Sequence, residues 1–296
     1  MVTSAQVPVS VIGTGRMGSA MAARIAGGPF DLAVWNRDVS KAERLASEIG
    51  ALVCSSIDEA AARSQVVITS LADDAAVESV YLGEGGIVSG VRTGAVVVDT
   101  STIDPETSRR VGGALDASGA GFLDAPVSGS VATAEAGNLT VMVGGDAGSL
   151  EIAAAVLETF ASRIVPVGGR GSGAVTKLAV NALVHGLNVS LSEALVLAER
   201  AGVDRHIAYE IFASGAGGAP FVHYKRQAFE DPAGTPVAFS LDLVAKDLDL
   251  ITTLARRVSA PIAQTEATAG IVSRAVAAGL GPRDMSAVAG FLRGGE

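Results

Sequence analysis

The sequence predicts a two-domain protein, with an α/β Rossmann-type N-terminal domain and an all-α C-terminal domain joined by a long interdomain helix. A GxGxxG motif at residues 13–18 stands between an apolar strand pattern at 7–12 and a helical run. Strand and helix patterns then alternate as far as residue 168. Beyond that point only helical periodicity is present. We therefore predict domains at residues 1–168 and 169–296, with the interdomain helix in the second.

The composition limits the kinds of partner. A chain of 296 residues is about right for two domains, and its net charge of −9 argues against nucleic-acid or anionic-membrane surfaces. Cys54 is the only cysteine, so an internal disulfide is impossible and a reducing cytoplasm fits. We see no signal-peptide pattern, no unbroken apolar run of about 18 residues, and no metal-ligand spacing. We expect a cytoplasmic protein without nucleic-acid, membrane or metal partners.

The first motif predicts a dinucleotide site. Gly13 suits the tight turn, Gly15 leaves room for a pyrophosphate, and Gly18 lets the helix pack on the strand. The phosphates are expected at the helix N-terminus. The predicted cofactor-binding residues here are Gly13, Thr14, Gly15, Arg16, Met17 and Gly18. The alternative is an ordinary glycine-rich turn.

The next strand, at 32–35, bears on the choice of cofactor. An NAD site usually has an acid at the end of this strand, but Asn36 and Arg37 stand here. A guanidinium beside a neutral residue suits the 2′-phosphate of NADP, so we predict NADP, with NAD possible. The alternative is a solvated Arg37, with Asp38 accepting the ribose hydroxyl.

Strands at 65–71 and 95–99 continue the sheet, followed by a helix opened by Asp104 as its N-cap. Ligands of parallel sheets collect beyond the carboxyl ends of the strands. The loops there are expected to contact adenosine and nicotinamide through Leu71, Ala72, Ser101 and Thr102. For Ser101 and Thr102, helix capping is an equal alternative.

A strand at 121–125 leads to Ser128, Gly129 and Ser130, just before a short helix at 131–137. Backbone N–H groups and hydroxyls at such a position can bind an anion such as a carboxylate, although a capped turn without ligand is the alternative. The domain is expected to close with a strand at 139–144, a helix at 147–160 and a strand at 162–166.

The second half is predicted to be helical throughout. Its first helix, 171–201, would exceed about 40 Å. Lys177 and Asn181 lie four residues apart on one face of it and can address one small polar ligand. His185 continues that face, where a packed core residue is the commoner explanation. The remaining helices are expected at 203–215, 219–229, 240–257, 263–280 and 282–292. Lys246 and Asp247 suggest a surface ion pair.

Five separated motifs together resemble the β-hydroxyacid dehydrogenases, the family of 3-hydroxyisobutyrate dehydrogenase, tartronate semialdehyde reductase and the glyoxylate/succinic semialdehyde reductases. They span nearly the whole chain in the order expected of that family. The stretches are VIGTGRMGSAMA (11–22), DTSTIDP (99–105), DAPVSGS (124–130) with GNLTVMVGG (137–145), GSGAVTKLAVN (171–181) and KDLDL (246–250).

The resemblance implies reversible hydride transfer between NAD(P) and a small 3-hydroxy acid or its aldehyde, in a protein that is usually a dimer. It implies that Lys177 donates or accepts the proton at the substrate oxygen. A free lysine has a pKa of about 10.4, so burial or cationic neighbours would have to lower it. The other implied roles are substrate binding by Ser128, Gly129, Ser130 and Asn181, and a place near nicotinamide for Thr102 and Lys246.

Three departures from the family pattern leave the substrate open. Ser130 and Thr133 replace glycines, which could narrow the pocket or add hydrogen bonds, and Ala72 replaces a proline. The alternative functions are an imine reductase-like enzyme, which generally lacks the lysine at position 177, a decarboxylating phosphogluconate dehydrogenase, or a non-catalytic NADP-binding protein. A homodimer or homotetramer is expected.

Overall fold

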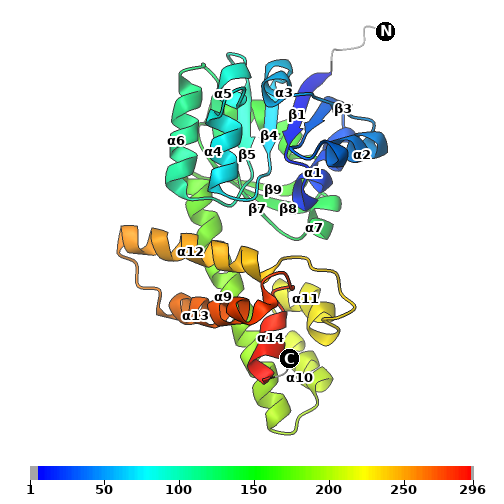
Figure 1. Cartoon of the computed structure of the whole chain (residues 1–296), viewed down its shortest axis with the longest axis vertical. Helices are drawn as coiled ribbons and strands as arrows, with labels where there is room; N and C mark the ends of the chain where they lie inside the picture. Colours follow the sequence, from blue (N-terminus) through cyan, green and yellow to red (C-terminus); the bar gives the residue numbers. More distant parts are fainter. Residues whose placement is uncertain (1–5, 295–296) are drawn as a thin grey trace. The chain divides into compact units, whose positions relative to one another are not determined.

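The structure is a computed structural model that describes residues 6–294 (Figure 1). Two compact units divide between Lys177 and Leu178, within the long helix α9 (Ser172–Arg200). The first unit is a sheet with helices on both faces, and the second is a cluster of helices.

The sheet of the first unit has the doubly wound order β3-β2-β1-β4-β5-β6 in its parallel part. Strand β8 pairs antiparallel with β6 and β7 and parallel with β9. The strand order reverses between β1 and β4, where ligands of such sheets bind. The bounds are β1 Val7–Ile12, β2 Phe30–Trp35, β3 Leu52–Val53, β4 Val66–Thr69, β5 Val96–Asp99, β6 Gly121–Asp124, β7 Val127–Ser128, β8 Leu139–Gly144 and β9 Ala161–Gly168.

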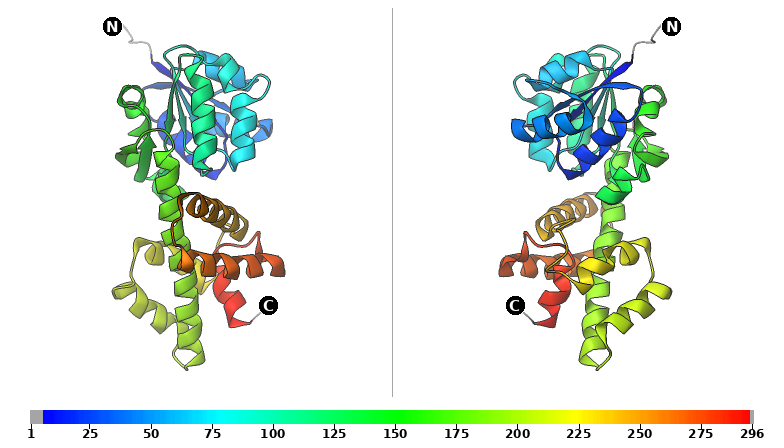
Figure 2. Two further views of the ribbon diagram at one scale, coloured as in Figure 1. Left: turned by 90° about the vertical axis from the view of Figure 1, so that its left-hand side faces the viewer. Right: turned by 90° about the vertical axis from the view of Figure 1, so that its right-hand side faces the viewer.

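Alternating side chains give the sheet two apolar faces, as expected of strands buried on both sides. Val9 and Val11 pack toward α1 (Arg16–Ala26), α2 (Val39–Ile49) and α8 (Ala147–Leu157). Ile12 and Val67 pack on the opposite face. The helices there are α3 (Ile57–Arg63), α4 (Asp74–Leu82), α5 (Ile87–Gly90) and α6 (Pro105–Asp116). Figure 2 shows helices on both sides of this sheet.

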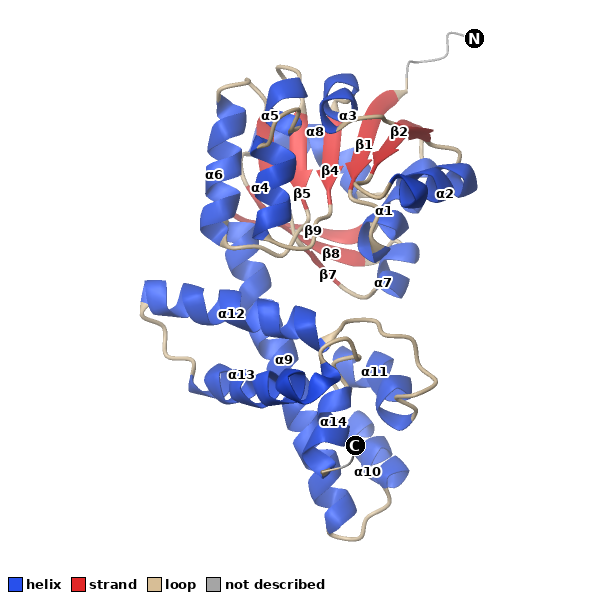
Figure 3. Ribbon diagram, viewed as in Figure 1, coloured by secondary structure: helices blue, strands red, loops and turns tan. Residues whose placement is uncertain are grey.

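The second unit is helical, as predicted (Figure 3). Its core includes Leu195, Tyr209, Leu248 and Val288, which come from four different helices. Apart from an isolated bridge between Ser240 and Asp284, it has no strand pairing in the part of the chain that the structure describes. Its other helices are α10 Arg205–Ser214, α11 Pro220–Glu230, α12 Leu241–Val258, α13 Ala263–Ala275 and α14 Ala287–Arg293.

Several short elements were not predicted from the sequence. Helices α3, α4 and α5 and strand β3 fall in stretches for which no element was predicted, and β7 has only two residues. The helix expected at 263–280 ends at Ala275 and continues as a π-helical turn. Gly279 adopts φ +87° there, a conformation that ends regular helix and favours glycine. Short elements carry too few periods to be detected.

Helix α9 is long and apolar enough to cross a membrane by length and composition alone. Polar residues interrupt the apolar positions of α9, so the sequence contains no unbroken apolar run of that length, although the average hydropathy of the helix is high. Half of the most apolar window of α9 is buried within the fold. Core helices of soluble proteins meet the same criterion, so the finding is weak evidence for a span.

Candidate cofactor and substrate sites

The glycine loop between β1 and α1 has the geometry that the motif predicts. Gly13 has φ +96°, and a Cβ there would lie 2.4 Å from the carbonyl oxygen of Ser70. A Cβ on Gly18 would lie 2.0 Å from the carbonyl oxygen of Gly13, whereas Gly15 faces open space. Gly13 and Gly18 therefore make the tight turn and the close helix packing possible, and Gly15 leaves the backbone accessible.

The start of α1 fits a dinucleotide pyrophosphate. Gly15 is the N-cap, and no side chain caps the helix. The hydroxyl of Thr14 is buried without a hydrogen-bond partner among the described residues. The N–H groups at a helix N-terminus lack partners within the helix, and a phosphate would bind both to them and to the unpartnered Thr14 hydroxyl beside them. Arg16 and Met17 form the first turn, next to these groups.

Asn36 at the end of β2 holds the glycine loop in place. Its side-chain oxygen accepts from the Thr14 N–H at 3.0 Å, and its side-chain nitrogen donates to the Asp38 carbonyl at 3.0 Å. Arg37 is exposed and makes no hydrogen bond or ion pair among residues 6–294. The Ser40 hydroxyl donates to the Asp38 carboxylate at 2.7 Å and lowers the pKa of Asp38. Arg37 is thus available to a ligand, while Asp38 already has a partner.

A buried carboxylate organises the ends of β4 and β5. Asp99 accepts from the Ser101 hydroxyl at 2.6 Å and from the Thr69 hydroxyl at 2.7 Å. The Ser101 oxygen in turn accepts from the Leu71 N–H at 2.9 Å. Burial raises the pKa of Asp99, although these hydrogen bonds oppose the shift. The network fixes the two loops that carry Leu71, Ala72 and Thr102, three predicted cofactor-binding residues.

Ser101 does not cap the helix that follows it, because its hydroxyl donates to Asp99. Asp104 caps α6 by accepting from the Glu106 N–H at 2.8 Å, as predicted. The supporting roles of Asp99 and Thr69 were not predicted from the sequence. The available signal was a carboxylate at the end of an apolar strand, directly before two hydroxyl residues.

The loop after β7 is shaped by Gly129, which has φ +139° and leaves no room for a side chain against Leu139. Ser130 caps α7 (Val131–Glu135) in a reciprocal capping box with Thr133, and their hydroxyl oxygens lie 2.9 Å apart. The two substitutions noted in the sequence therefore stabilise a helix start together. Ser128 is half-buried. Substrate contacts by Ser128, Gly129 and Ser130 stay predictions.

A polar cluster joins α9 and α12 in the second unit. The Asn181 side-chain nitrogen donates to Asp247 Oδ2 at 2.7 Å, and His185 Nε2 lies 3.4 Å from the same oxygen. Lys246 Nζ is 3.1 Å from Asp247 Oδ1. The Asp247 side chain is only 1% exposed, so this is a buried cluster and not the surface ion pair that the sequence suggested. His185 is buried as expected and stacks on Phe239.

The cluster determines which end of Asn181 is free to bind a ligand. Burial alone would raise the pKa of Asp247, but the His185 hydrogen bond and the charge of Lys246 oppose it, and the net effect lowers that pKa. An ionised carboxylate accepts only, so the Asn181 nitrogen faces it and the Asn181 oxygen points elsewhere. Asn181 therefore offers an acceptor, on the helix face that carries Lys177 four residues earlier.

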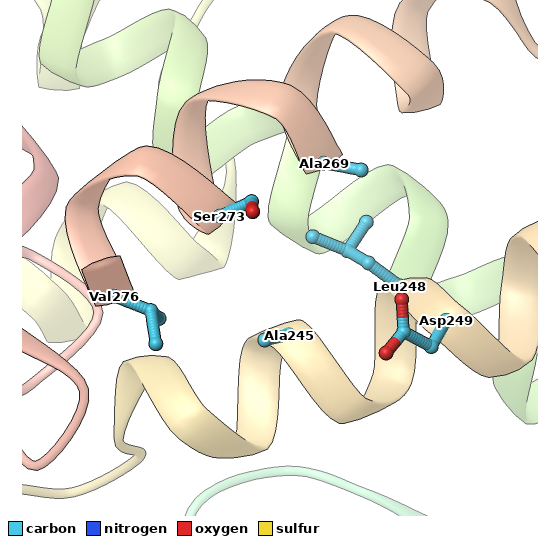
Figure 4. A pocket seen from close by; sticks show the side chains of 6 residues that line it. All are labelled: Ala245, Leu248, Asp249, Ala269, Ser273 and Val276. Carbon is cyan, nitrogen blue, oxygen red and sulfur yellow. The ribbon is translucent and has the colours of Figure 1, made fainter.

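A cavity of about 130 Å³ lies between α12 and α13, and none of the polar-cluster residues lines it (Figure 4). It is lined by Ala245, Leu248, Asp249, Ala269, Ser273 and Val276. None is a predicted site residue, and the walls are mostly small or apolar, so we interpret it as a packing gap. No group of three His, Cys, Asp or Glu side chains in residues 6–294 could hold a metal ion.

Family models cover the two halves of the chain. One, described as the NAD binding domain of 6-phosphogluconate dehydrogenase, matches residues 8–169. Another, described as NAD-binding of NADP-dependent 3-hydroxyisobutyrate dehydrogenase, matches residues 171–292. The chain belongs to the β-hydroxyacid dehydrogenase family. Like the β-hydroxyacid dehydrogenases it resembles, it is an NAD(P)-dependent oxidoreductase.

Named members of the β-hydroxyacid dehydrogenase family align over nearly the full length. The chain is 34% identical to 2-(hydroxymethyl)glutarate dehydrogenase of Eubacterium barkeri, over 95% of this chain and 93% of the relative. It is also 34% identical to glyoxylate/succinic semialdehyde reductase 1 of Arabidopsis thaliana, over 95% of this chain and 96% of that relative. The solved structure of Psf3 in complex with NADP+ and 2-OPP matches with a TM-score of 0.87 and 26% identity. The match covers 96% of this chain and 99% of the Psf3 chain.

Imine reductases are more distant. The structure of an imine reductase from Pseudomonas sp. matches with TM-score 0.65 at 23% identity, covering 96% of this chain and 98% of that one. At that identity the similarity shows a shared fold only. The β-hydroxyacid dehydrogenase assignment thus stands over the imine-reductase alternative.

Proposed function

We propose that this enzyme reduces a small carboxylate-bearing aldehyde, and oxidises the matching 3-hydroxy acid, with NADP as preferred cofactor and Lys177 as general acid and base. The observation that carries the proposal is the face of α9 on which Lys177 precedes Asn181 by one turn. Asp247 holds the Asn181 side chain there with its nitrogen toward the carboxylate and its oxygen away from it. The relatives named for glyoxylate, succinic semialdehyde and 2-(hydroxymethyl)glutarate support this substrate class.

NADP, which would be held by the glycine loop at residues 13–18 and by Arg37, would supply the hydride as NADPH in reduction and accept it as NADP+ in oxidation. Lys177 gives its proton to the developing alkoxide oxygen during reduction and takes the hydroxyl proton during oxidation. While charged, Lys177 also stabilises the negative charge on that oxygen. The Asn181 oxygen, which faces away from the Asp247 carboxylate, offers an acceptor to a substrate donor other than the reacting hydroxyl, whose proton passes to Lys177. Ser128 and Gly129 bind the carboxylate through N–H and hydroxyl donors.

A survey of aldehydes tests the proposal. NADPH oxidation is followed with glyoxylate, succinic semialdehyde, methylmalonate semialdehyde and tartronate semialdehyde, each also with NADH. Turnover of one aldehyde with a preference for NADPH is the expected result. Tight NADPH binding without turnover of any of them would favour the non-catalytic alternative, and turnover of cyclic imines instead would favour the imine-reductase one.

The NADP preference is assigned to Arg37. Replacing Arg37 with alanine should raise the Kd for NADPH about tenfold or more, because a charge-assisted hydrogen bond to the 2′-phosphate is lost. The Kd for NADH should stay within about twofold. Both are measured by fluorescence titration, with the exposed Arg44 on α2 changed to alanine as control. Equal weakening of both cofactors would show that Arg37 does not read the 2′-phosphate.

We also propose that the helical unit forms a homodimer or homotetramer. Large apolar side chains are exposed on α9 and α10: Leu183 (66%), Leu197 (72%), Ile207 (58%) and Ile211 (63%). Leu183 and Leu197 are fourteen residues apart, close to four helical turns, and so share a face. Exposed apolar surface of this kind marks interfaces.

Introducing a charge into that surface should separate the subunits. The double variant Leu197→Glu/Ile211→Glu is expected to elute as a monomer in light-scattering chromatography, whereas the wild type is not. Val39→Glu, at a position of the first unit that is 56% exposed, serves as control. A wild-type protein that is already monomeric would contradict the proposal.

We place the enzyme in the cytoplasm. Its single cysteine, Cys54, is buried and free, which suits a reducing compartment. Cell fractionation would test this directly.

A further inference from the structure

The start of α9 is capped by a side chain from a distant part of the chain. Asp124 ends β6, and its residue is 2% exposed. Its Oδ1 accepts from the Gly171 N–H at 2.8 Å, and its Oδ2 accepts from the Ala174 N–H at 2.9 Å. N–H groups at a helix start have no partner within the helix. Both oxygens of one carboxylate therefore hold the first turn of α9 from 47 and 50 residues away.

Close backbone packing holds the same junction in one position. A Cβ on Gly173 would lie 2.2 Å from the Asp124 carbonyl oxygen and 2.6 Å from that of Met142. A Cβ on Gly144 would lie 2.5 Å from Asp124 Oδ1. Gly171 has φ +89°, a conformation that favours glycine. The helix start is thus pressed against β6 and β8, with little freedom to shift.

The junction lies between two parts of the proposed site. Lys177 follows Ala174 by three residues, less than one turn of α9. On the other side, Asp124 directly precedes residues 125–129, which end in the Ser128–Gly129 loop proposed to bind the substrate carboxylate. One carboxylate therefore connects the helix of the proposed proton donor to the loop of the proposed substrate anchor.

We propose that Asp124 is a positioning residue of the reaction, which fixes the start of α9 and with it the placement of Lys177 relative to the Ser128–Gly129 loop. This inference rests on the proposed function of Lys177. Asp124 makes its contacts with the backbone and takes no part in proton transfer to substrate.

Because Asp124 is buried and charged, its effect on catalysis can be distinguished from its effect on folding stability. Burial raises the pKa of Asp124 to about 6, against the effect of the backbone hydrogen bonds from Ala174 and Gly171. Between the ordinary pKa of about 3.9 and this value the folded protein holds a proton that the unfolded chain lacks. Stability therefore falls as pH rises through that window, and above it the ionisation of Asp124 causes no further change with pH. At pH 8 the buried ionised carboxylate is a cost to folding.

The test is Asp124→Asn, assayed at pH 8 with succinic semialdehyde and NADPH. The carboxamide keeps one acceptor but turns its NH₂ group toward the second backbone N–H, so α9 must shift. Removing the buried charge offsets the lost hydrogen bond, so the melting temperature should stay near that of the wild type. We expect kcat to fall about ten- to hundredfold, the effect of a misplacement near 1 Å, while the Kd for NADPH stays within about twofold.

Two further variants complete the test. Gly173→Ala leaves the carboxylate intact but displaces α9 from β6, so it should also lower kcat with little change in NADPH binding. Asp146→Asn is the matched control, because Asp146 caps α8, which carries no proposed site residue. Its kcat should match the wild type.

The outcomes separate this inference from the proposed function. Wild-type kcat and KM in Asp124→Asn would overturn the positioning role while leaving Lys177 untouched. A fall in kcat that only follows a smaller folded fraction, or that Asp146→Asn shares, would overturn it too. Failure of the wild type to turn over succinic semialdehyde or any other aldehyde in the survey would instead refute the proposed function on which it rests.

Discussion

Replacing Lys177 with methionine is expected to abolish turnover and to leave NADPH binding intact. Methionine has a similar length and a comparable helix propensity, so α9 should persist. The methionine side chain has no charge and no proton that it could transfer to the substrate. General acid–base catalysis contributes about 10²–10⁴-fold, and loss of charge stabilisation at the alkoxide adds to this, so kcat should fall at least about a thousandfold.

The measurement is steady-state kcat with the preferred aldehyde, together with the Kd for NADPH by fluorescence titration. Lys177→Arg separates the two roles of the lysine, because arginine keeps the charge but does not give up a proton near neutral pH. It should recover part of the loss through charge stabilisation alone. A Lys177→Met enzyme that keeps kcat within tenfold of the wild type would show that another group moves the proton.

The cofactor loop could be predicted from sequence because its requirements are local. Gly13, Gly15 and Gly18 have their roles within six residues of one another, and the neighbouring strand and helix patterns supply the context. The structure shows the turn and the close approach for which those glycines are needed. The long helix and the helical second unit were predicted for the same reason, since each follows from periodicity along a continuous stretch.

The supporting carboxylates could not be predicted in that way. Asp124 meets Gly171, and Asp247 meets Asn181, across 47 and 66 residues. No spacing rule connects such partners, so only the fold reveals them. Asp247 even gave a misleading signal, because a Lys–Asp step on a helix is usually exposed, whereas this carboxylate is buried.

Ser130 and Thr133 show the opposite case, a local signal from which the capping box could have been predicted. Their spacing of three is that of a capping box, in which each side chain bonds the backbone N–H of the other. Comparison with the family pattern directed attention to the pocket instead. The structure shows that the two residues together stabilise a helix start.

A second large effect is expected in the core of the helical unit, from Asp284→Ala. Lys225 Nζ lies 2.8 Å from both Asp284 oxygens, and the two side chains are 6% and 8% exposed. Removing the carboxylate leaves a buried ammonium without its counter-charge, which typically costs about 3–5 kcal/mol. The free energy of unfolding in urea should fall by that amount. The exposed Asp249 changed to alanine is the control.

Lys225→Met should lower the free energy of unfolding by less than Asp284→Ala does, because the Asp284 carboxylate has hydrogen-bond donors in addition to Lys225. Asp284 also accepts backbone hydrogen bonds from Ala238, Phe239 and Ser286. After Lys225→Met the carboxylate keeps these three donors, and a buried carboxylate with several N–H partners is far less costly than a bare charge. A larger loss in Lys225→Met than in Asp284→Ala would contradict this reasoning.

The pH dependence gives a further check on the same pair. Burial alone would raise the pKa of Asp284, but the hydrogen bond and charge of Lys225 outweigh it and lower that pKa. The stabilisation is therefore fully present above the unfolded pKa of about 3.9 and is lost as pH falls through the lower folded value. The difference between wild type and Asp284→Ala should be constant from pH 5 to 8 and shrink only below about pH 4.

The consequence of losing Asp284 should extend to the polar cluster on α9. Asp284 fixes the backbone of Phe239, whose ring stacks on His185, and His185 lies beside the Asp247 oxygen that binds Asn181. Asp284→Ala should therefore raise the KM for the aldehyde even at temperatures where the protein remains folded. If KM is unchanged while stability falls, the ion pair stabilises the helical core without influencing Asn181.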